Sequence, residues 1–343
     1  MIHARPNLNR RQFLGVTALA TASLPSAFAA VEPVAGAAAK RKIGCLSWCF
    51  HNLSPGVDPE PAIDIIGELG FDGIELIVTA RGDLKTFWTD DRIDRLKLKL
   101  ERHKLAVSQF ALFQPVVEDL SSTKREERDQ ALDYFAAGCR IAAKLNAPMV
   151  DIVAPWAREL KGPTTYLPRY YDIEQPKPGE KFHIDIADGF DWERVWNGFV
   201  ETVKACLERA KAHGLKYSIE NHTHTLVPDT GSLLRLLDSI RDPALGVNLD
   251  VGWIQLEREY PPVAIHKLKG HLMNVHMRDI DGLMRSFSPF GDGVMDIKAI
   301  VEALHKTGFN GFASIEQDTH PGDPDMKEIC RRYLRIMREY SAS

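Results

Sequence analysis

The stretch Tyr217-Ser218-Ile219-Glu220-Asn221-His222 contains a short apolar run that ends on a carboxylate. The pattern recurs in Gly246-Val247-Asn248-Leu249-Asp250-Val251-Gly252, Asn274-Val275-His276-Met277-Arg278-Asp279 and Ala313-Ser314-Ile315-Glu316-Gln317-Asp318. Each run has the length of a β-strand, and helical patterns separate them. In a closed barrel of parallel strands, the residues at the strand ends converge on one mouth. These stretches therefore predict four neighbouring strands that bring Glu220, Asp250, His276 and Glu316 together.

The same alternation of apolar runs and helical patterns extends toward the N-terminus. Strands are predicted at 43–48, 73–78, 105–112, 148–153, 216–220, 245–250, 271–276 and 312–316. Helices are predicted near 59–69, 91–103, 124–145, 191–213, 230–241, 261–269, 296–307 and 325–341. Alternating strands and helices are typical of an α/β protein with a parallel sheet. Eight units in one chain predict a (β/α)8 TIM barrel, a single domain over residues 43–343.

One connection interrupts this rhythm. Residues 157–190 combine prolines and glycines with charged residues and tyrosines. A connection of this length is unusual between a strand and the next helix of a compact domain. It predicts an elaborated loop at the functional face of the barrel.

The first residues have the features of a targeting segment. Asn9-Arg10-Arg11-Gln12-Phe13-Leu14-Gly15 places two arginines before an uncharged stretch that ends in Ala27-Phe28-Ala29. This arrangement resembles a twin-arginine signal peptide. We expect residues 1–29 to direct export to the periplasm and residues 30–42 to form a linker. A Sec signal or an uncleaved anchor is the alternative, although Pro25 and the moderate hydrophobicity of the stretch argue against a stable membrane anchor.

Composition excludes some classes of function. Hydrophobic residues make up 44% and charged residues 26% of the chain, as in soluble globular proteins. The formal net charge of -4 argues against a nucleic-acid partner, since such proteins carry basic patches. The five cysteines do not predict a disulfide framework. Cys45 and Cys49 are too far apart if their strand stays extended, and Cys139, Cys206 and Cys330 are expected to pack as small apolar residues.

The four strand-end residues predict a metal site. A single carboxylate at a strand end is better explained by loop capping. Three clustered carboxylates, however, repel one another unless a positive charge lies between them. Three oxygen ligands and one imidazole suit Mn2+, which we expect first, or Mg2+, Co2+ or Fe2+. Zn2+ also remains open, but the absence of thiolate ligands argues against a structural zinc site.

From residue 43 to about residue 340 the chain resembles the sugar phosphate isomerase/epimerase family of xylose-isomerase-like TIM barrels. The stretches that carry the resemblance are Gly70-Phe71-Asp72-Gly73-Ile74-Glu75, Ile219-Glu220-Asn221-His222, Asn248-Leu249-Asp250-Val251-Gly252, Val275-His276-Met277-Arg278-Asp279, Pro289-Phe290-Gly291-Asp292-Gly293 and Ser314-Ile315-Glu316. The resemblance implies that Glu220, Asp250, His276 and Glu316 bind the metal. It does not specify a substrate, because one fold supports many reactions.

Two departures from the family pattern affect the substrate site. A histidine common in the family three residues after the strand-six aspartate is replaced by Trp253, which could stack on a sugar ring. Arg278 stands where a lysine is common; it could bind a carboxylate or vicinal oxygens with its planar fork, or pair with Asp279 or Asp250.

Other residues near the strand ends are candidates for the same pocket. His222 and His224 follow strand five and could bind the substrate or act as acid or base, with solvated loop histidines as the alternative. Trp48 and His51 follow strand one and could form a wall of the pocket, although Trp48 could equally belong to the core. Glu75 in strand two is a candidate partner of a metal ligand.

These residues support three hypotheses. The first is a metal-dependent isomerase or epimerase of a sugar or keto-sugar that acts through an enediolate next to a carbonyl; the resemblance implies that Glu220 and Glu316 remove and return the proton. The second is a lyase that cleaves 3-keto-glycosides by elimination after the same first step. The third is a non-catalytic carbohydrate-binding barrel. The expected partner is a small-molecule carbohydrate, and the sequence leaves open whether the chain forms a homo-oligomer.

Overall fold

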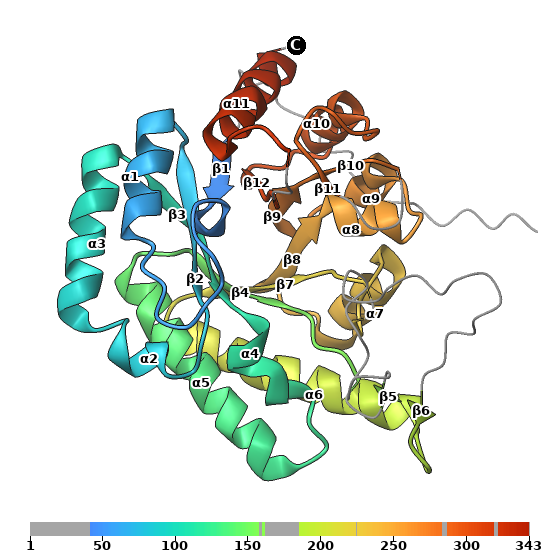
Figure 1. Ribbon diagram of the computed structural model, residues 1–343. Coiled ribbons are helices and arrows are strands. Elements are labelled where there is room, and N and C mark those ends of the chain that lie inside the picture. Colours follow the sequence, from blue (N-terminus) through green and yellow to red (C-terminus); the bar gives the residue numbers. More distant parts are fainter. Residues whose placement is uncertain are drawn as a thin grey trace, which may run out of the picture. The chain divides into compact units, whose positions relative to one another are not determined.

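A closed barrel of eight parallel strands lies at the centre of the protein, surrounded by helices (Figure 1). The computed structural model describes residues 42–157, 160–161, 185–223, 225–282, 287–318 and 322–342. Around the barrel the strands are β1 (Lys42–Leu46), β12 (Phe312–Ile315), β9 (Leu272–Met277), β8 (Leu245–Asp250), β7 (Lys216–Glu220), β4 (Met149–Val153), β3 (Ala106–Leu112) and β2 (Gly73–Val78). The predicted (β/α)8 TIM barrel is confirmed.

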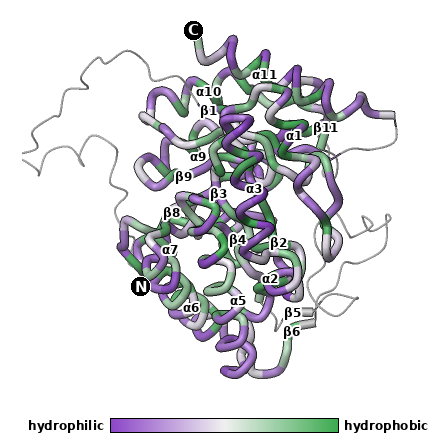
Figure 2. The backbone as a smooth tube through the Cα atoms, turned by 90° about the vertical axis from the view of Figure 1, so that its left-hand side faces the viewer, coloured by the Kyte–Doolittle hydropathy of each residue, from purple (hydrophilic) through white to green (hydrophobic). Residues whose placement is uncertain are grey.

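The long helices occupy the positions expected between the strands. They are α1 (Glu60–Leu69), α3 (Asp90–His103), α5 (Arg125–Lys144), α6 (Trp192–Ala212), α7 (Thr230–Ile240), α9 (Pro261–Lys267), α10 (Ile297–Lys306) and α11 (Met326–Ala342). Their termini follow from local chemistry. The Asp191 side chain accepts hydrogen bonds from the first turn of α6, and Gly214, just beyond that helix, has a φ of 71° that favours glycine. Hydrophobic and hydrophilic residues alternate along the helices (Figure 2).

The sequence did not predict several short helices and strands, because they are too short to show a periodicity. They are the 3-10 helices η1 (Ser47–Cys49) and η2 (Glu118–Ser121), the helices α2 (Asp83–Thr86), α4 (Gln114–Val117) and α8 (Val251–Leu256), and two small antiparallel pairs. One pair joins β10 (Asp279–Ile280) to β11 (Phe287–Ser288), and the other joins β5 (Leu160–Lys161) to β6 (Asp185–Ile186). The expected long loop at 157–190 contains β5 and β6, but its residues 158–159 and 162–184 lie outside the described part of the chain.

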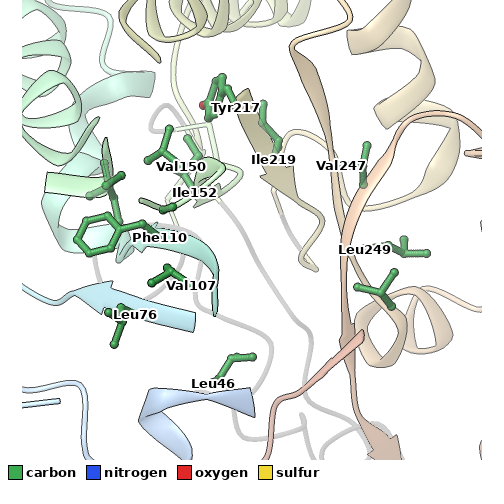
Figure 3. Packing of buried hydrophobic residues seen from close by; sticks show 14 of the residues in the cluster. Leu46, Leu76, Val107, Phe110, Val150, Ile152, Tyr217, Ile219, Val247 and Leu249 are labelled. Carbon is green, nitrogen blue, oxygen red and sulfur yellow. The ribbon is translucent and has the colours of Figure 1, made fainter. Parts of the chain in front are cut away.

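Apolar and polar side chains alternate along several strands of the barrel. In β7, Tyr217 and Ile219 belong to the hydrophobic core, whereas Ser218 and Glu220 are buried polar residues. Strands β8, β9 and β12 repeat the pattern, because successive strand residues point to opposite faces. Apolar side chains from successive strands, including Leu76, Phe110, Ile152 and Ile219, gather in one cluster (Figure 3). The buried polar side chains on the opposite face of these strands form the site.

The cysteines are all free and buried, as expected. The reason given for Cys45 and Cys49 is wrong, however. Strand β1 ends at Leu46 and continues into η1, so the chain does not stay extended, and the Cys45 thiol interacts with the thiols of Cys49 and Cys330. Burial raises the pKa of Cys45 well above its usual value, which keeps this group a thiol.

None of the helices in the described part of the chain is long and apolar enough to cross a membrane. The expected signal peptide and linker, residues 1–29 and 30–42, lie outside the described residues except for Lys42, which begins β1.

Candidate metal centre

Four strand ends bring the predicted quartet together. Glu220 and Asp250 are the last residues of β7 and β8, His276 is the penultimate residue of β9, and Glu316 directly follows β12. Register places Asp250 opposite His276 on the neighbouring strand. One ligand atom from each of the four side chains lies within 4.8 Å of those from the others, and all four residues are buried. Neighbouring parallel strands thus convert four distant sequence positions into one cluster that could hold a metal ion.

A fourth carboxylate, that of Glu75, fixes the orientation of the imidazole. His276 Nε2 lies 2.9 Å from Glu75 Oε2, and both side chains are fully buried. A carboxylate can only accept in this contact, so Nε2 carries the proton. Nδ1 faces Glu316 Oε2 at 2.9 Å and Glu220 Oε2 at 3.4 Å, and it is the ring nitrogen left to bind a metal. This is the usual way in which a metal-binding histidine is held, and it gives Glu75 the partner role that its position in the sequence suggested.

Glu75→Gln is expected to weaken metal binding by about 10- to 100-fold, the usual effect of losing a carboxylate that orients a histidine ligand. Glutamine keeps the volume of the side chain but removes the charge that holds the Nε2 proton. Isothermal titration with Mn2+ measures the effect. Glu302→Gln, which removes an exposed carboxylate that pairs with Lys306 in α10, should leave the affinity unchanged.

Two carboxylates of the quartet, those of Asp250 and Glu316, are held by several donors. Asp250 Oδ1 accepts from the backbone N–H groups of Gly252 at 2.7 Å and Trp253 at 2.9 Å, at the start of α8. Glu316 Oε1 accepts from Trp48 Nε1 at 3.3 Å and contacts Arg278 Nη2. Glu316 Oε2 is buried and faces His276 Nδ1 at 2.9 Å. These donors fix which Glu316 oxygen faces the centre of the cluster.

The pKa values report an excess of negative charge in the cluster. Burial raises the pKa of Glu220 to about 7 and that of Asp250 to about 6, even though His276 and Arg278 act in the opposite direction. Burial would also raise the pKa of Glu316, but Arg278 and His276 lower it to about 2. Burial disfavours a charged His276, yet Glu75 and Glu220 raise its pKa well above the usual value. Burial is thus the largest cause of the raised pKa values of Glu220 and Asp250, and the neighbouring carboxylates raise them further.

These observations fit a divalent metal. The cluster combines three buried carboxylates with an imidazole whose Nδ1 faces two of them, and a divalent cation would neutralise the carboxylates that gather there. The donor set of oxygen and imidazole nitrogen suits Mn2+, Mg2+, Co2+, Fe2+ or Zn2+. Glu220, Asp250, His276 and Glu316 would hold the ion.

A cavity of about 440 Å³ opens onto the cluster. Trp48, His222, Trp253 and Arg278, four of the residues expected to contact the substrate, are among its lining residues. His222 is buried and stacks on Trp253 with ring centroids 3.9 Å apart, so it is not a solvated loop histidine. His51 does not line this cavity; its Nδ1 lies 2.7 Å from the Asn52 carbonyl. His224 lies outside the described residues.

The cavity also contains a carboxylate that sequence reasoning missed. Asp151 in β4 lines the cavity and is 1% exposed. Its Oδ1 accepts from Ser218 Oγ at 2.7 Å, and burial raises its pKa well above the usual value. Gln109 in β3 continues this polar contact network to His276 Nε2 at 3.4 Å. Both residues lie inside strands rather than at strand ends. They could have been predicted only from the alternation of inward and outward side chains, and only if the neighbouring strands were already known.

Arg278 pairs with Asp250 and not with its neighbour Asp279. Its Nε lies 2.8 Å from Asp250 Oδ2, whereas Asp279 accepts backbone N–H groups of Ile280, Gly291, Gly293 and Met295. Asp279 thereby fixes the segment that follows β11. That strand carries Phe287, an aromatic wall of the cavity.

Comparisons with known proteins support the fold, and the similar proteins include enzymes with different activities. A family model described as a xylose isomerase-like TIM barrel matches residues 63–340. An inosose dehydratase from Lacticaseibacillus casei is 23% identical over an alignment of 164 residues, and the match covers 42% of this chain and 54% of that protein. The chain thus spans about half the length of the curated relatives it matches.

Solved structures are similar over most of the chain. D-psicose 3-epimerase from Clostridium cellulolyticum H10, solved with D-tagatose, has a TM-score of 0.68 and 18% identity, and the match covers 88% of this chain and 99% of that one. An L-ribulose 3-epimerase has a TM-score of 0.67 and 16% identity, with 88% and 96% covered. At these identities the likeness shows the fold alone.

Proposed function

Because the chain belongs to the xylose isomerase-like TIM barrel family, we propose that it is a divalent-metal-dependent isomerase or epimerase of a sugar or keto-sugar. The observation that carries the proposal is the convergence of Glu220 and Glu316, with Asp250 and His276, on one cavity. Two carboxylates at such a site can remove and return a proton. The epimerases among the similar structures agree with this chemistry.

The residues have distinct tasks in the proposed reaction. A divalent cation supplies Lewis-acid stabilisation of the negative charge that develops on the oxygen atoms of the substrate. Glu220, with a pKa raised to about 7, takes the proton from the carbon next to the carbonyl. In an epimerisation Glu316 would have to enter the step as the carboxylic acid, give its proton to the opposite face of the enediolate and leave as the carboxylate, while Glu220 keeps the proton that it removed. Trp253 and Phe287, whose rings meet edge to face at 4.9 Å, supply apolar surface for the sugar ring.

The cavity favours a substrate without a phosphate group. Among its described lining residues Arg278 is the only lysine or arginine, and its guanidinium already contacts Asp250, Glu316 and Asp318. A phosphate would meet carboxylates with no further fixed cation beside them. We therefore propose an uncharged sugar or keto-sugar.

Cleavage of 3-keto-glycosides by elimination is the second candidate, and one feature of the site favours it. Arg278 and Trp48 hold Glu316 Oε1, and the pKa of Glu316 is lowered to about 2, so Glu220 is much the stronger base. Elimination needs only one base: Glu220 removes the C2 proton of the keto-glycoside, the electron pair forms the C1–C2 double bond, and the anomeric substituent leaves. A similarity to inosose dehydratase is consistent with this reading.

Proton NMR in D2O distinguishes the candidates. The mature chain, loaded with Mn2+ and then exchanged into Mg2+ for spectroscopy, is incubated with a panel of ketohexoses and 3-keto-glycosides. An isomer that carries deuterium next to the carbonyl supports the isomerase or epimerase. Release of the aglycone supports the lyase. No deuterium incorporation into any member of the panel, by a chain that binds metal, would leave the carbohydrate-binding barrel as the better interpretation.

We also propose that the chain is exported to the periplasm by the twin-arginine route, on the strength of Arg10 and Arg11 and the Ala27-Phe28-Ala29 cleavage pattern. Fractionation of cells tests this proposal. The mature chain should be found in the periplasm, and replacing both arginines by lysine should leave the precursor in the cytoplasm. Equal export of the double-lysine chain would contradict the assignment.

A further inference from the structure

Arg278 occupies a position that the proposed reaction does not explain. The residue is 5% exposed, and each nitrogen of its guanidinium contacts a different carboxylate. Nε lies 2.8 Å from Asp250 Oδ2, Nη1 lies 2.9 Å from Asp318 Oδ2, and Nη2 contacts Glu316 Oε1. Two of these three carboxylates belong to the metal quartet. The planar fork therefore joins two metal ligands to a third carboxylate on the rim.

The surroundings are shaped for this side chain. The guanidinium lies over the Phe287 ring at 4.2 Å and near the Trp253 ring at 5.7 Å. Gly252 gives the stem its room, because a Cβ there would lie 2.9 Å from Arg278 Cβ and 3.1 Å from Cδ. An aromatic face, a glycine and three acceptors thus hold Arg278 in one place. Such a combination indicates a built position rather than a chance surface ion pair.

Electrostatics determine what this position does to a metal ion. A guanidinium beside Asp250 and Glu316 supplies part of the positive charge that these carboxylates need when no metal is bound. When a divalent cation binds the same two carboxylates, it is repelled by the nearby guanidinium and must share their negative charge. The arginine and the metal therefore compete electrostatically, although they occupy different positions.

We propose that Arg278 is an internal counter-ion of the metal site: it stabilises the metal-free chain and lowers the affinity of the site for the divalent metal. The proposal rests on the metal site of the proposed function. Its consequence is a site that stays folded before loading and releases the metal more readily than the four ligands alone would. Arg278 thereby acts as a positioning residue through Asp250 and Glu316.

The test compares Arg278→Met with the parent chain, both stripped with a chelator. Methionine keeps an unbranched stem in the space beside Gly252 but removes the charge. We expect the metal-free variant to melt several degrees below the metal-free parent, because Asp250 and Glu316 lose their counter-ion. We expect its affinity for Mn2+, measured by isothermal titration, to rise by at least about tenfold. The melting temperature should consequently gain more from Mn2+ in the variant than in the parent.

Arg92→Met is the matched control. Arg92 also lies over an aromatic ring, that of Phe87 at 4.1 Å, and also approaches a carboxylate, Asp58, at 3.7 Å, but far from the quartet in sequence and on α3. The affinity of the Arg92→Met chain for Mn2+ should equal that of the parent. Unchanged or weaker Mn2+ binding by Arg278→Met would overturn the proposal, since Arg278 would then only orient the ligands or be irrelevant to them.

A measurement on the parent chain covers the case in which Arg278→Met does not fold. The guanidinium Nε–H signal of Arg278, assigned with Arg278→Lys, should shift when diamagnetic Mg2+ is added, because the metal withdraws charge from Asp250 Oδ2. A signal that does not move while Mg2+ binds would also overturn the proposal. Absence of any metal binding by the parent is a different result: it would remove the metal site of the proposed function itself.

Discussion

Glu220→Gln is expected to reduce solvent proton exchange at the substrate carbon by at least about a thousandfold, within the range for loss of a general base. The amide keeps the length of the side chain at the end of β7 and can still accept the hydrogen bond that Asn248 Nδ2 donates to Glu220 Oε2 at 3.1 Å. It cannot take a proton from carbon. Deuterium incorporation from D2O, followed by NMR on the substrate that the panel identifies, measures the loss.

Glu220 is also a proposed metal ligand, so lost activity has two explanations. Metal content must therefore be measured on the same sample, and the assay run at Mn2+ concentrations that saturate the variant. Glu302→Gln is the control for the chemical change itself. Exchange at the parental rate by a metal-saturated Glu220→Gln chain would exclude Glu220 as the base. Glu316 would then be the remaining carboxylate of the quartet with access to the cavity, and Asp151 the next candidate.

The sequence predicted the fold well because eight strands of a buried barrel leave a clear signal. The bounds of β2, β7 and β8 agree with those predicted, and the others differ by one or two residues. Strand ends are the positions that a barrel uses for its site, so Glu220, Asp250, His276 and Glu316 could be selected from sequence alone. Their roles as ligands remain predictions that the geometry supports.

The parts that the sequence did not predict depend on which strands are neighbours. Asp151 and Gln109 lie within strands and become part of the site only because β3, β4 and β7 are adjacent in the barrel. The sequence does not decide whether Arg278 pairs with Asp250 or with Asp279. Asp279 is its neighbour in sequence, and Asp250 ends the neighbouring strand of the expected barrel. The loop after β11 decides this, since its backbone N–H groups satisfy Asp279 and leave Asp250 for the guanidinium.

The polar face of the barrel explains why the quartet can exist in a folded chain. Five buried carboxylates, those of Glu75, Asp151, Glu220, Asp250 and Glu316, lie around His276. Isolated buried charges are strongly unfavourable, so each must be protonated, hydrogen-bonded or paired. Ser218 donates to Asp151, His276 donates to Glu75, and Arg278 pairs with Asp250 and Glu316. Glu220, with its raised pKa, is the ligand that these partners satisfy least.

His276→Ala is expected to remove the metal. The imidazole contributes the one nitrogen of the donor set, and its Nδ1 faces both glutamates. Losing a residue that merely orients a ligand costs about 10- to 100-fold in affinity, so losing the ligand itself should cost at least about a hundredfold. Inductively coupled plasma mass spectrometry on the purified protein should find near-stoichiometric Mn, Co, Fe or Zn in the parent and little in the variant.

His271→Ala is the control, because His271 is an exposed histidine that directly precedes β9, five residues before His276. It should retain the parental metal content. Equal metal in His276→Ala and the parent would place the ion elsewhere and separate the quartet from metal binding. A parent without metal, even after dialysis against Mn2+ and Co2+, would have a wider consequence. The clustered carboxylates would then be neutralised by protons and by Arg278 alone, and Glu220, protonated near neutral pH, would be a donor for a bound carbohydrate rather than the base of an enzyme.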